Sequence, residues 1–213
     1  MSSLYQYKYP TDTIKCYKFI SKDIGYITAK SIKQEDISVI KTEFTNTKGI
    51  IIDMRNYPMI DISQNLVPFF VSNSTPFVKF TCGNSDNPGE FSFKEECEVT
   101  KWESESIYQG KLVVLVNENT QSHAEFITMA LQVGDNTTVI GSQTAGADGN
   151  VSKIVLPGGL ETWFSGIGVY YPDGRQTQRI GIVPDIEVKP TIKGLIERRD
   201  ELLEKAIEVI NSD

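Results

Sequence analysis

Ser122 is the residue best placed to act as a nucleophile. It follows a short apolar run at residues 112–116, which ends at the polar turn 117–120 and has the composition of a buried strand. Apolar residues then recur at helical spacing over residues 126–133, so the hydroxyl of Ser122 is expected at the N-terminus of a helix. Unpaired backbone N–H groups and the positive end of the helix dipole lie there, and both favour negative charge on an attacking serine oxygen.

The same residues also fit a purely structural role. Ser122 and Glu125 match the SxxE pattern of a capping box, in which the serine caps the helix and the glutamate bonds back to the serine amide. Most serines in this pattern are only caps, so the spacing alone leaves both roles open.

His123 is the only histidine in the chain. Sites built from several histidines are therefore excluded, and a conventional Ser-His-Asp triad would depend on this residue. Adjacent residues on a helix point about 100° apart, so His123 is poorly placed to take the proton of Ser122. The three cysteines show no CxxC spacing and leave one over in any pairing. We expect neither a metal site nor a cofactor.

The segments around Ser122 are typical of alternating strands and helices. Strands are predicted at 24–29 and 49–54 with a helix at 34–44 between them, the order of a parallel pair with a crossover helix. A helix at 61–71 is limited by Pro68, and the polar segment 83–105 is predicted as a surface excursion with a hairpin around 87–90. The remaining predicted elements are strands at 77–82, 138–140, 151–156, 160–165 and 167–171 and a final helix at 191–210.

The length of 213 residues predicts one domain, with residues 1–23 as an N-terminal arm or edge strand. The net charge of -7 argues against nucleic-acid binding, which needs clustered lysine and arginine. No apolar run approaches the ~20 residues of a membrane span, and the first residues lack the apolar core of a signal peptide. We expect a periplasmic or cell-envelope location only if the chain is a domain of a longer precursor.

Four segments occur in the order found in the catalytic domain of the tail-specific, or C-terminal processing, serine peptidases. They are GIIIDMRNYP (49–58), VVLVNENTQSHAEFITMALQ (113–132), TVIGSQTAGADGNV (138–151) and YYPDGRQTQRIGIVPDIEV (170–188). With IGYI at 24–27, the resemblance covers about residues 24–190. Within that family, the chain looks most like the Bacteroidetes-type members. It implies an α/β fold of the Clp protease/crotonase-like type, with stacked strand and helix units and a mixed sheet. It also implies a serine-type endopeptidase acting on polypeptides, with residues 24–213 as the catalytic domain.

The resemblance places the nucleophile on Ser122, because SHAE at 122–125 matches the family's SASE. It implies an oxyanion hole made of two backbone N–H groups. One belongs to His123, and the other to Met59, which stands where the family has a glycine. A methionine amide can serve if it adopts the dihedral angles of that glycine.

The family's general base, a lysine in FGKG, has no counterpart in this chain. Its position falls on Ala147 or, with one inserted residue, on Asp148. Relatives of the tricorn type use a histidine and a glutamate instead, where this chain has Thr28 and Gln178. Asp148 has the right chemistry only if burial raises its pKa towards neutrality, and is otherwise a solvated turn residue.

Two main hypotheses follow. The chain is either a serine peptidase or a degenerate member that keeps a groove for a peptide or small apolar ligand without cleaving it, since a serine without a base is a weak nucleophile. A crotonase-like thioester enzyme is a more distant third. A peptide substrate would bind in extended form along a strand edge. We predict a structural ion pair between Asp53 and Arg55. The aromatic residues at 163, 164, 170 and 171 could line a groove, but alternating aromatic residues on strands usually belong to the core, where we place them. The oligomeric state is not predicted.

Overall fold

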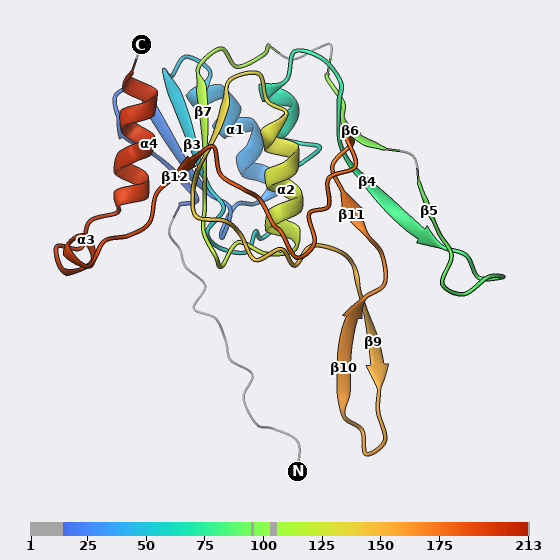
Figure 1. The fold of residues 1–213 in the computed structure, drawn as a ribbon. Helices are drawn as coiled ribbons and strands as arrows, with labels where there is room; N and C mark the ends of the chain where they lie inside the picture. Colours follow the sequence, from blue (N-terminus) through green and yellow to red (C-terminus); the bar gives the residue numbers. More distant parts are fainter. Residues whose placement is uncertain (1–14, 95, 103–105, 213) are drawn as a thin grey trace.

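The structure is a computed structural model that describes residues 15–94, 96–102 and 106–212 (Figure 1). Its centre is a six-stranded sheet in the order β1-β2-β3-β7-β8-β12. β1 is antiparallel to β2, and the other neighbouring pairs are parallel, so the sheet is mixed. Its strands are β1 (Tyr17–Ser21), β2 (Ile24–Thr28), β3 (Gly49–Asp53), β7 (Lys111–Val116), β8 (Thr137–Gly141) and β12 (Ile186–Glu187).

Helices cover both faces of this sheet. Helices α1 (Gln34–Phe44) and α2 (His123–Gln132) lie on one face and α4 (Glu201–Asn211) on the other (Figure 1). Ile50 and Ile52 of β3 pack into the cluster with α1 and α2, whereas Ile51 packs with α4. Because side chains alternate along a strand and both faces are covered, β3 and β7 are apolar almost throughout.

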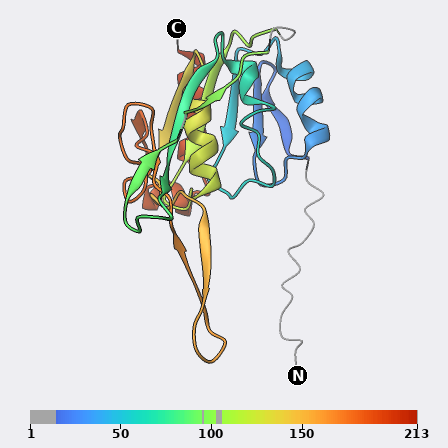
Figure 2. The ribbon, with the colours of Figure 1, turned by 90° about the vertical axis from the view of Figure 1, so that its right-hand side faces the viewer.

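The other strands form smaller sheets beside the central one. β4 (Thr75–Gly83) pairs with β5 (Phe91–Phe93), β6 (Cys97–Val99) and β11 (Val169–Tyr170). β9 (Val151–Val155) and β10 (Glu161–Ser165) form a two-stranded hairpin that projects from the body in both views (Figures 1 and 2).

Most predicted elements are confirmed. The helix at 34–44 has the predicted bounds, and β2-α1-β3 is the expected parallel unit. The segment 83–105 carries the predicted hairpin, in which the amide of Asn84 bonds to the carbonyl of Glu90 at 2.9 Å. Residues 17–21 form an edge strand, as the N-terminal prediction allowed; residues 1–14 lie outside the described part, and the boundary at residue 23 stays a prediction.

Two predicted helices are wrong in extent. The segment 61–71 contains only the short 3-10 helix η1 (Val67–Phe70), since Pro68 lacks the N–H that a helix interior needs. The final helix is broken into α3 (Ile192–Ile196) and α4. Arg198 takes a left-handed conformation with φ of 56°, and the side chain of Asp200 starts α4 by accepting from the amide of Leu203.

The prediction of a core position is wrong for two aromatic residues. Trp163 and Phe164 lie on the projecting hairpin and are 58% and 49% exposed. Among the described strands, theirs pairs only with its hairpin partner β9, so alternation did not imply burial. Within the described residues, no helix combines the length and apolarity needed to cross a bilayer.

Candidate active site

The loops that follow β3, β7 and β8 lie at the carboxyl edge of the parallel strands, where α/β proteins place their sites. Ser122 ends the loop after β7 and immediately precedes α2, as predicted. Its backbone has φ of 52° and ψ of -122°, a region that residues with a Cβ rarely occupy. Such strain clusters at functional sites, and a sharp turn between strand and helix exposes a serine hydroxyl.

A cavity of about 470 Å³ opens at Ser122. It brings together three residues singled out in the sequence: Ser122, His123 and Asp148. The complete lining is Tyr57, Asp61, Phe80, Ser122, His123, Phe126, Asp148, Gly149, Asn150 and Val151, a set without a lysine.

Aromatic rings form one wall of this cavity. Phe80 and Phe126 stack with centroids 6.2 Å apart, and the His123 ring stacks on Phe126 at 5.9 Å. The imidazole therefore contributes to the wall, and the wall offers an apolar surface next to Ser122.

Asp148 is buried, with only 7% of its surface exposed. Its Oδ1 accepts a hydrogen bond of 2.7 Å from the amide of Gly149, while its Oδ2 is buried without a hydrogen-bond partner among the described residues. Burial raises the pKa of Asp148 to about 7; the bond from Gly149 lowers it and the charge of Glu125 raises it further. Asp148 is thus not a solvated turn residue.

Glu125 joins the helix of Ser122 to the loop of Asp148. Its carboxylate is fully buried and accepts four hydrogen bonds. One comes from the amide of Ser122 at 3.0 Å, which is the reciprocal bond expected of a capping box. The other three come from the loop: Thr144 Oγ1 at 2.5 Å, the Gly146 amide at 2.7 Å and the Ala147 amide at 2.9 Å.

The loop of Asp148 is also held from its other side. Thr144 Oγ1 accepts from the amide of Ile182 at 2.7 Å, and the Arg179 amide donates to the carbonyl of Gly146 at 2.6 Å. Gly146 has φ of 66°, and a Cβ there would lie 2.8 Å from Arg179 backbone, so only glycine fits. Gln178 donates from its side-chain amide to the carbonyl of Asp148 at 2.9 Å.

The two predicted oxyanion donors differ in their surroundings. The amide of His123, at the first position of α2, makes no hydrogen bond to the part of the chain that the structure describes. The amide of Met59 donates to the carbonyl of Ala29 at 2.9 Å, and Met59 is not part of the cavity lining. The prediction for Met59 does not match this arrangement, because the loop after β3 runs along the end of β2 and bonds to it.

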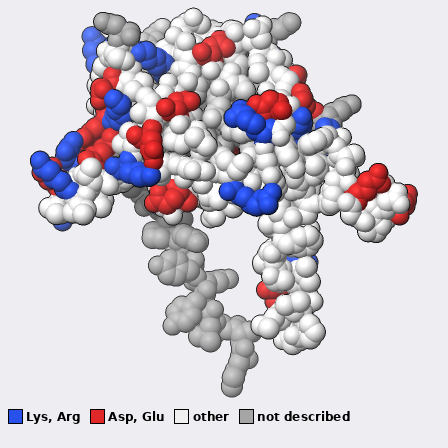
Figure 3. Space-filling view, in the orientation of Figure 1, with Lys and Arg blue, Asp and Glu red and all other residues white. Residues whose placement is uncertain are grey.

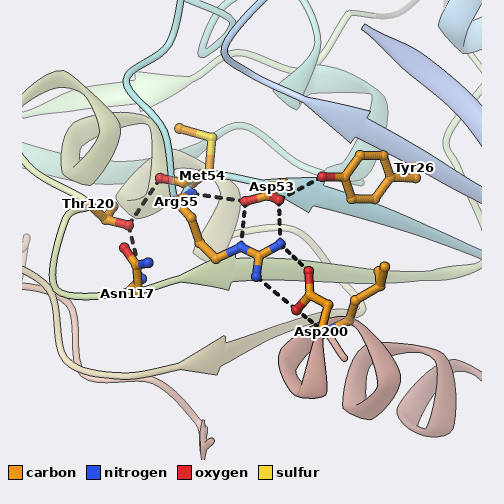
Figure 4. Close-up of polar contacts among 8 residues, drawn as sticks. Tyr26, Asp53, Met54, Arg55, Asn117, Thr120 and Asp200 are labelled. Atoms are coloured by element: carbon orange, nitrogen blue, oxygen red, sulfur yellow. Dashed lines mark hydrogen bonds and ion pairs between the residues drawn. The ribbon is translucent and has the colours of Figure 1, made fainter. Parts of the chain in front are cut away.

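The predicted ion pair between Asp53 and Arg55 is present and is part of a larger network (Figure 4). Arg55 binds Asp53 and Asp200 through two bonds each, with nitrogen-to-oxygen distances of 2.7–3.0 Å, and Tyr26 donates to Asp53 at 2.6 Å. Burial opposes the charge of Arg55, but the two carboxylates outweigh it and hold its pKa above the ordinary value. Burial likewise opposes the charge of Asp200, and Arg55 outweighs it, which holds the pKa of Asp200 below its ordinary value.

Three residues with structural roles at the site were missed or underestimated in the sequence. Glu125 was interpreted only as a cap, and Thr144 and Gln178 were given no role in holding the loop. A glutamate at the third position of a largely apolar helix was the available signal, because a buried carboxylate must collect donors from elsewhere. Lys153, on β9, forms an ion pair with Glu161 on β10.

Several known proteins resemble this chain in sequence or in fold. A carboxyl-terminal-processing protease of Synechocystis sp. is 24% identical over 183 residues, covering 83% of this chain and 40% of that protein. A Parabacteroides merdae protein described as a candidate peptidase superposes with a TM-score of 0.78 and 20% identity, over 92% of this chain and 64% of that one. Mature CPAF bound to lactacystin gives a TM-score of 0.69 and 17% identity, over 89% of this chain and 52% of that one.

These likenesses confirm the predicted α/β fold of the Clp protease/crotonase-like type with a mixed sheet. The chain spans less than half the length of the curated relatives that it matches. The model of Peptidase family S41, whose members are serine peptidases, matches residues 23–188, most of the chain. The resemblance to the C-terminal processing peptidases is therefore confirmed: the chain belongs to peptidase family S41.

Proposed function

We propose that this chain is the catalytic domain of a serine endopeptidase in which Asp148 replaces the missing lysine. Ser122 Oγ attacks a peptide carbonyl while its proton passes to the Asp148 carboxylate. The protonated Asp148 then donates this proton to the leaving amine as the C–N bond breaks. Water hydrolyses the resulting acyl-serine by the same route, which regenerates both side chains.

The observation that carries the proposal is that Asp148, whose buried Oδ2 has no hydrogen-bond partner among the described residues, lines the same cavity as Ser122. A proton acceptor works best when its pKa lies near the working pH, and burial brings that of Asp148 to about 7. An ordinary surface aspartate is too weak a base for this task.

The oxyanion is expected to be stabilised chiefly by the amide of His123. A second donor is usually worth two to three orders of magnitude in rate. Since the Met59 amide is bonded to Ala29, we expect slow turnover relative to a peptidase with two free donors.

The cavity favours a polypeptide with an apolar residue beside the cleaved bond. Phe80 and Phe126 offer an apolar wall, and β9 begins at Val151, which lines the same cavity. An extended peptide that paired with the free edge of β9 would reach Ser122 directly.

An activated fluorophosphonate probe tests the nucleophile. We expect wild type to be labelled, with a rate that rises as the pH increases through about 7, because the Asp148 base must lose its proton. Ser122→Ala should abolish labelling, and Asp148→Asn should reduce its rate at least a hundredfold and remove the rise near neutrality. Labelling that persists in Ser122→Ala, or an unchanged pH profile in Asp148→Asn, would contradict the proposal.

The second candidate is a peptide-binding protein that does not cleave. The bond between the Met59 amide and Ala29 favours it, because it leaves the oxyanion hole with one free donor. This candidate predicts binding of an apolar fluorescent peptide, equal in wild type and Ser122→Ala, with no fluorophosphonate labelling up to about pH 9. Loss of this binding in Phe126→Asp, which alters the aromatic wall, would locate the peptide in the cavity.

A further inference from the structure

The β9–β10 hairpin has one face without charged residues. Cross-strand partners in its antiparallel register share a face, and successive residues alternate between faces. The bond from the Leu156 amide to the Leu160 carbonyl extends this register beyond β9. One face carries only two hydroxyl-bearing and four apolar side chains: Ser152, Thr162, Ile154, Leu156, Leu160 and Phe164. We call the four apolar residues the apolar face.

The apolar face is exposed. Its members range from 41% exposed at Ile154 to 68% at Leu160. Among the described strands, β9 and β10 pair only with each other, and an isolated two-stranded hairpin is marginally stable in water. A contiguous apolar patch on such an arm marks an interaction surface.

The charges of the hairpin lie on its opposite face. Lys153 and Glu161 belong to the face of Trp163, and they form an ion pair with each other. Figure 3 shows the hairpin mostly white, whereas charged side chains are spread over the body. The apolar face therefore offers nothing that would select an acidic or a basic partner.

We propose that the apolar face docks against the same face of a second copy of this chain. An antiparallel stack of two identical faces has two-fold symmetry, so each contact is formed twice. The chain carries a net charge of -7, and a copy can approach most easily through an uncharged surface. The hairpin projects from the body in both views, so two copies that meet through their hairpins need not bring their charged bodies into contact (Figures 1 and 2).

The size of the face predicts a weak, reversible dimer. Four half-exposed large side chains and the backbone between them present roughly 500 Å² per copy, or roughly 1,000 Å² in total, which is near the lower limit for a specific interface. We therefore expect a dissociation constant on the order of 10 µM. The stack leaves the hydrogen-bonding edge of β9 free, so the dimer does not depend on the proposed peptidase activity.

Sedimentation velocity over about 1 to 300 µM tests the dimer. The mass of wild type should rise with concentration from 23.8 kDa to twice that value. Leu160→Lys/Phe164→Lys, which charges the apolar face, should stay monomeric throughout. Val155→Lys/Trp163→Lys makes the same change on the opposite face and should dimerise like wild type within about threefold. All four positions are exposed, so both variants should keep the fold.

A second experiment tests whether the lysine variant is monomeric only because its hairpin has lost its structure. It mixes two variants whose apolar faces carry opposite charges. Leu160→Glu/Phe164→Glu should also be monomeric alone and should form a heterodimer with the lysine variant at low salt. The proposal is overturned if wild type is monomeric at every concentration, if the lysine variant of the apolar face still dimerises, or if the opposite-face variant loses the dimer equally. Binding of reduced, carboxymethylated casein to a monomeric wild type, lost in the apolar-face variant, would instead assign the face to polypeptide substrates.

Discussion

The backbone at Ser122 holds a residue with a Cβ in a conformation that suits glycine. We expect Ser122→Gly to be more stable than Ser122→Ala by about 1 kcal/mol, because both lack the hydroxyl but only glycine avoids the strain. Urea unfolding of the two variants measures this difference. Equal stabilities would show that the positive φ is not strained, and the argument that strain marks the site would fail.

Asp148 makes stability depend on pH. Its pKa is raised from 3.8 to about 7, so the folded protein binds a proton that the unfolded chain has lost between these values. The stabilisation present below about pH 4 is therefore lost as the pH rises through about 7. Asp148→Asn cannot lose a proton, and its unfolding free energy relative to wild type should increase by about 2 to 3 kcal/mol from about pH 5 to about pH 8.

The measurement is denaturant unfolding of both proteins at each pH, and only their difference is used because other carboxylates titrate in both. A difference that stays constant over this range would mean that Asp148 is ionised and solvated in the folded protein. That result would also remove the chemical reason for assigning it the role of base.

The environments of single residues were harder to predict from the sequence than the secondary structure or the fold. The sequence pointed to Ser122, His123 and Asp148, which line one cavity. It could not decide whether Asp148 is buried, because that depends on the Glu125 carboxylate and on a loop 30 residues away at Gln178. It also could not show that the Met59 amide bonds to Ala29, which is a contact between two distant loops.

Among the elements, α4 depends most on a contact far from it in sequence. Arg55 follows β3 and holds Asp200, the residue that caps α4. Arg55→Met should cost about 3 kcal/mol, because it leaves the buried Asp53 carboxylate without its cation and loosens the start of α4. Guanidinium unfolding measures the loss.

Arg199→Met is the matched control. Arg199 also pairs with a carboxylate, that of Glu204, but this pair is exposed to solvent and screened by it, so Arg199→Met should lower the stability far less than Arg55→Met. Comparable losses in the two variants would show that the network at Asp53 has no greater effect than a surface ion pair.

Elements with strong periodicity were predicted well, and the failures have local causes. The helix at 34–44 and the strands of the central sheet follow from spacing alone, since each buries one face or both. The break between α3 and α4 does not, because helical spacing continues through it. The break reflects Asp200, whose side chain serves the cap and Arg55 at once.

At the scale of the whole molecule, the order of the four motifs along the chain predicted the family and the fold better than any single motif did. Segments separated by up to about a hundred residues meet at one edge of the sheet, and the family match spans residues 23–188. The hairpin was predicted as two strands, but its exposure was not, since alternation tells which residues share a face and not whether anything covers that face.

Glu125 has one more consequence. Its carboxylate is attached to the helix that Ser122 begins, yet three of its four donors come from the segment that leads to Asp148. The proposed nucleophile Ser122 and the loop of the proposed base Asp148 are therefore both tied to one buried carboxylate by charge-assisted hydrogen bonds. We therefore expect the two side chains to keep a nearly constant separation, so that the approach of a substrate rather than motion between them would limit the proposed reaction.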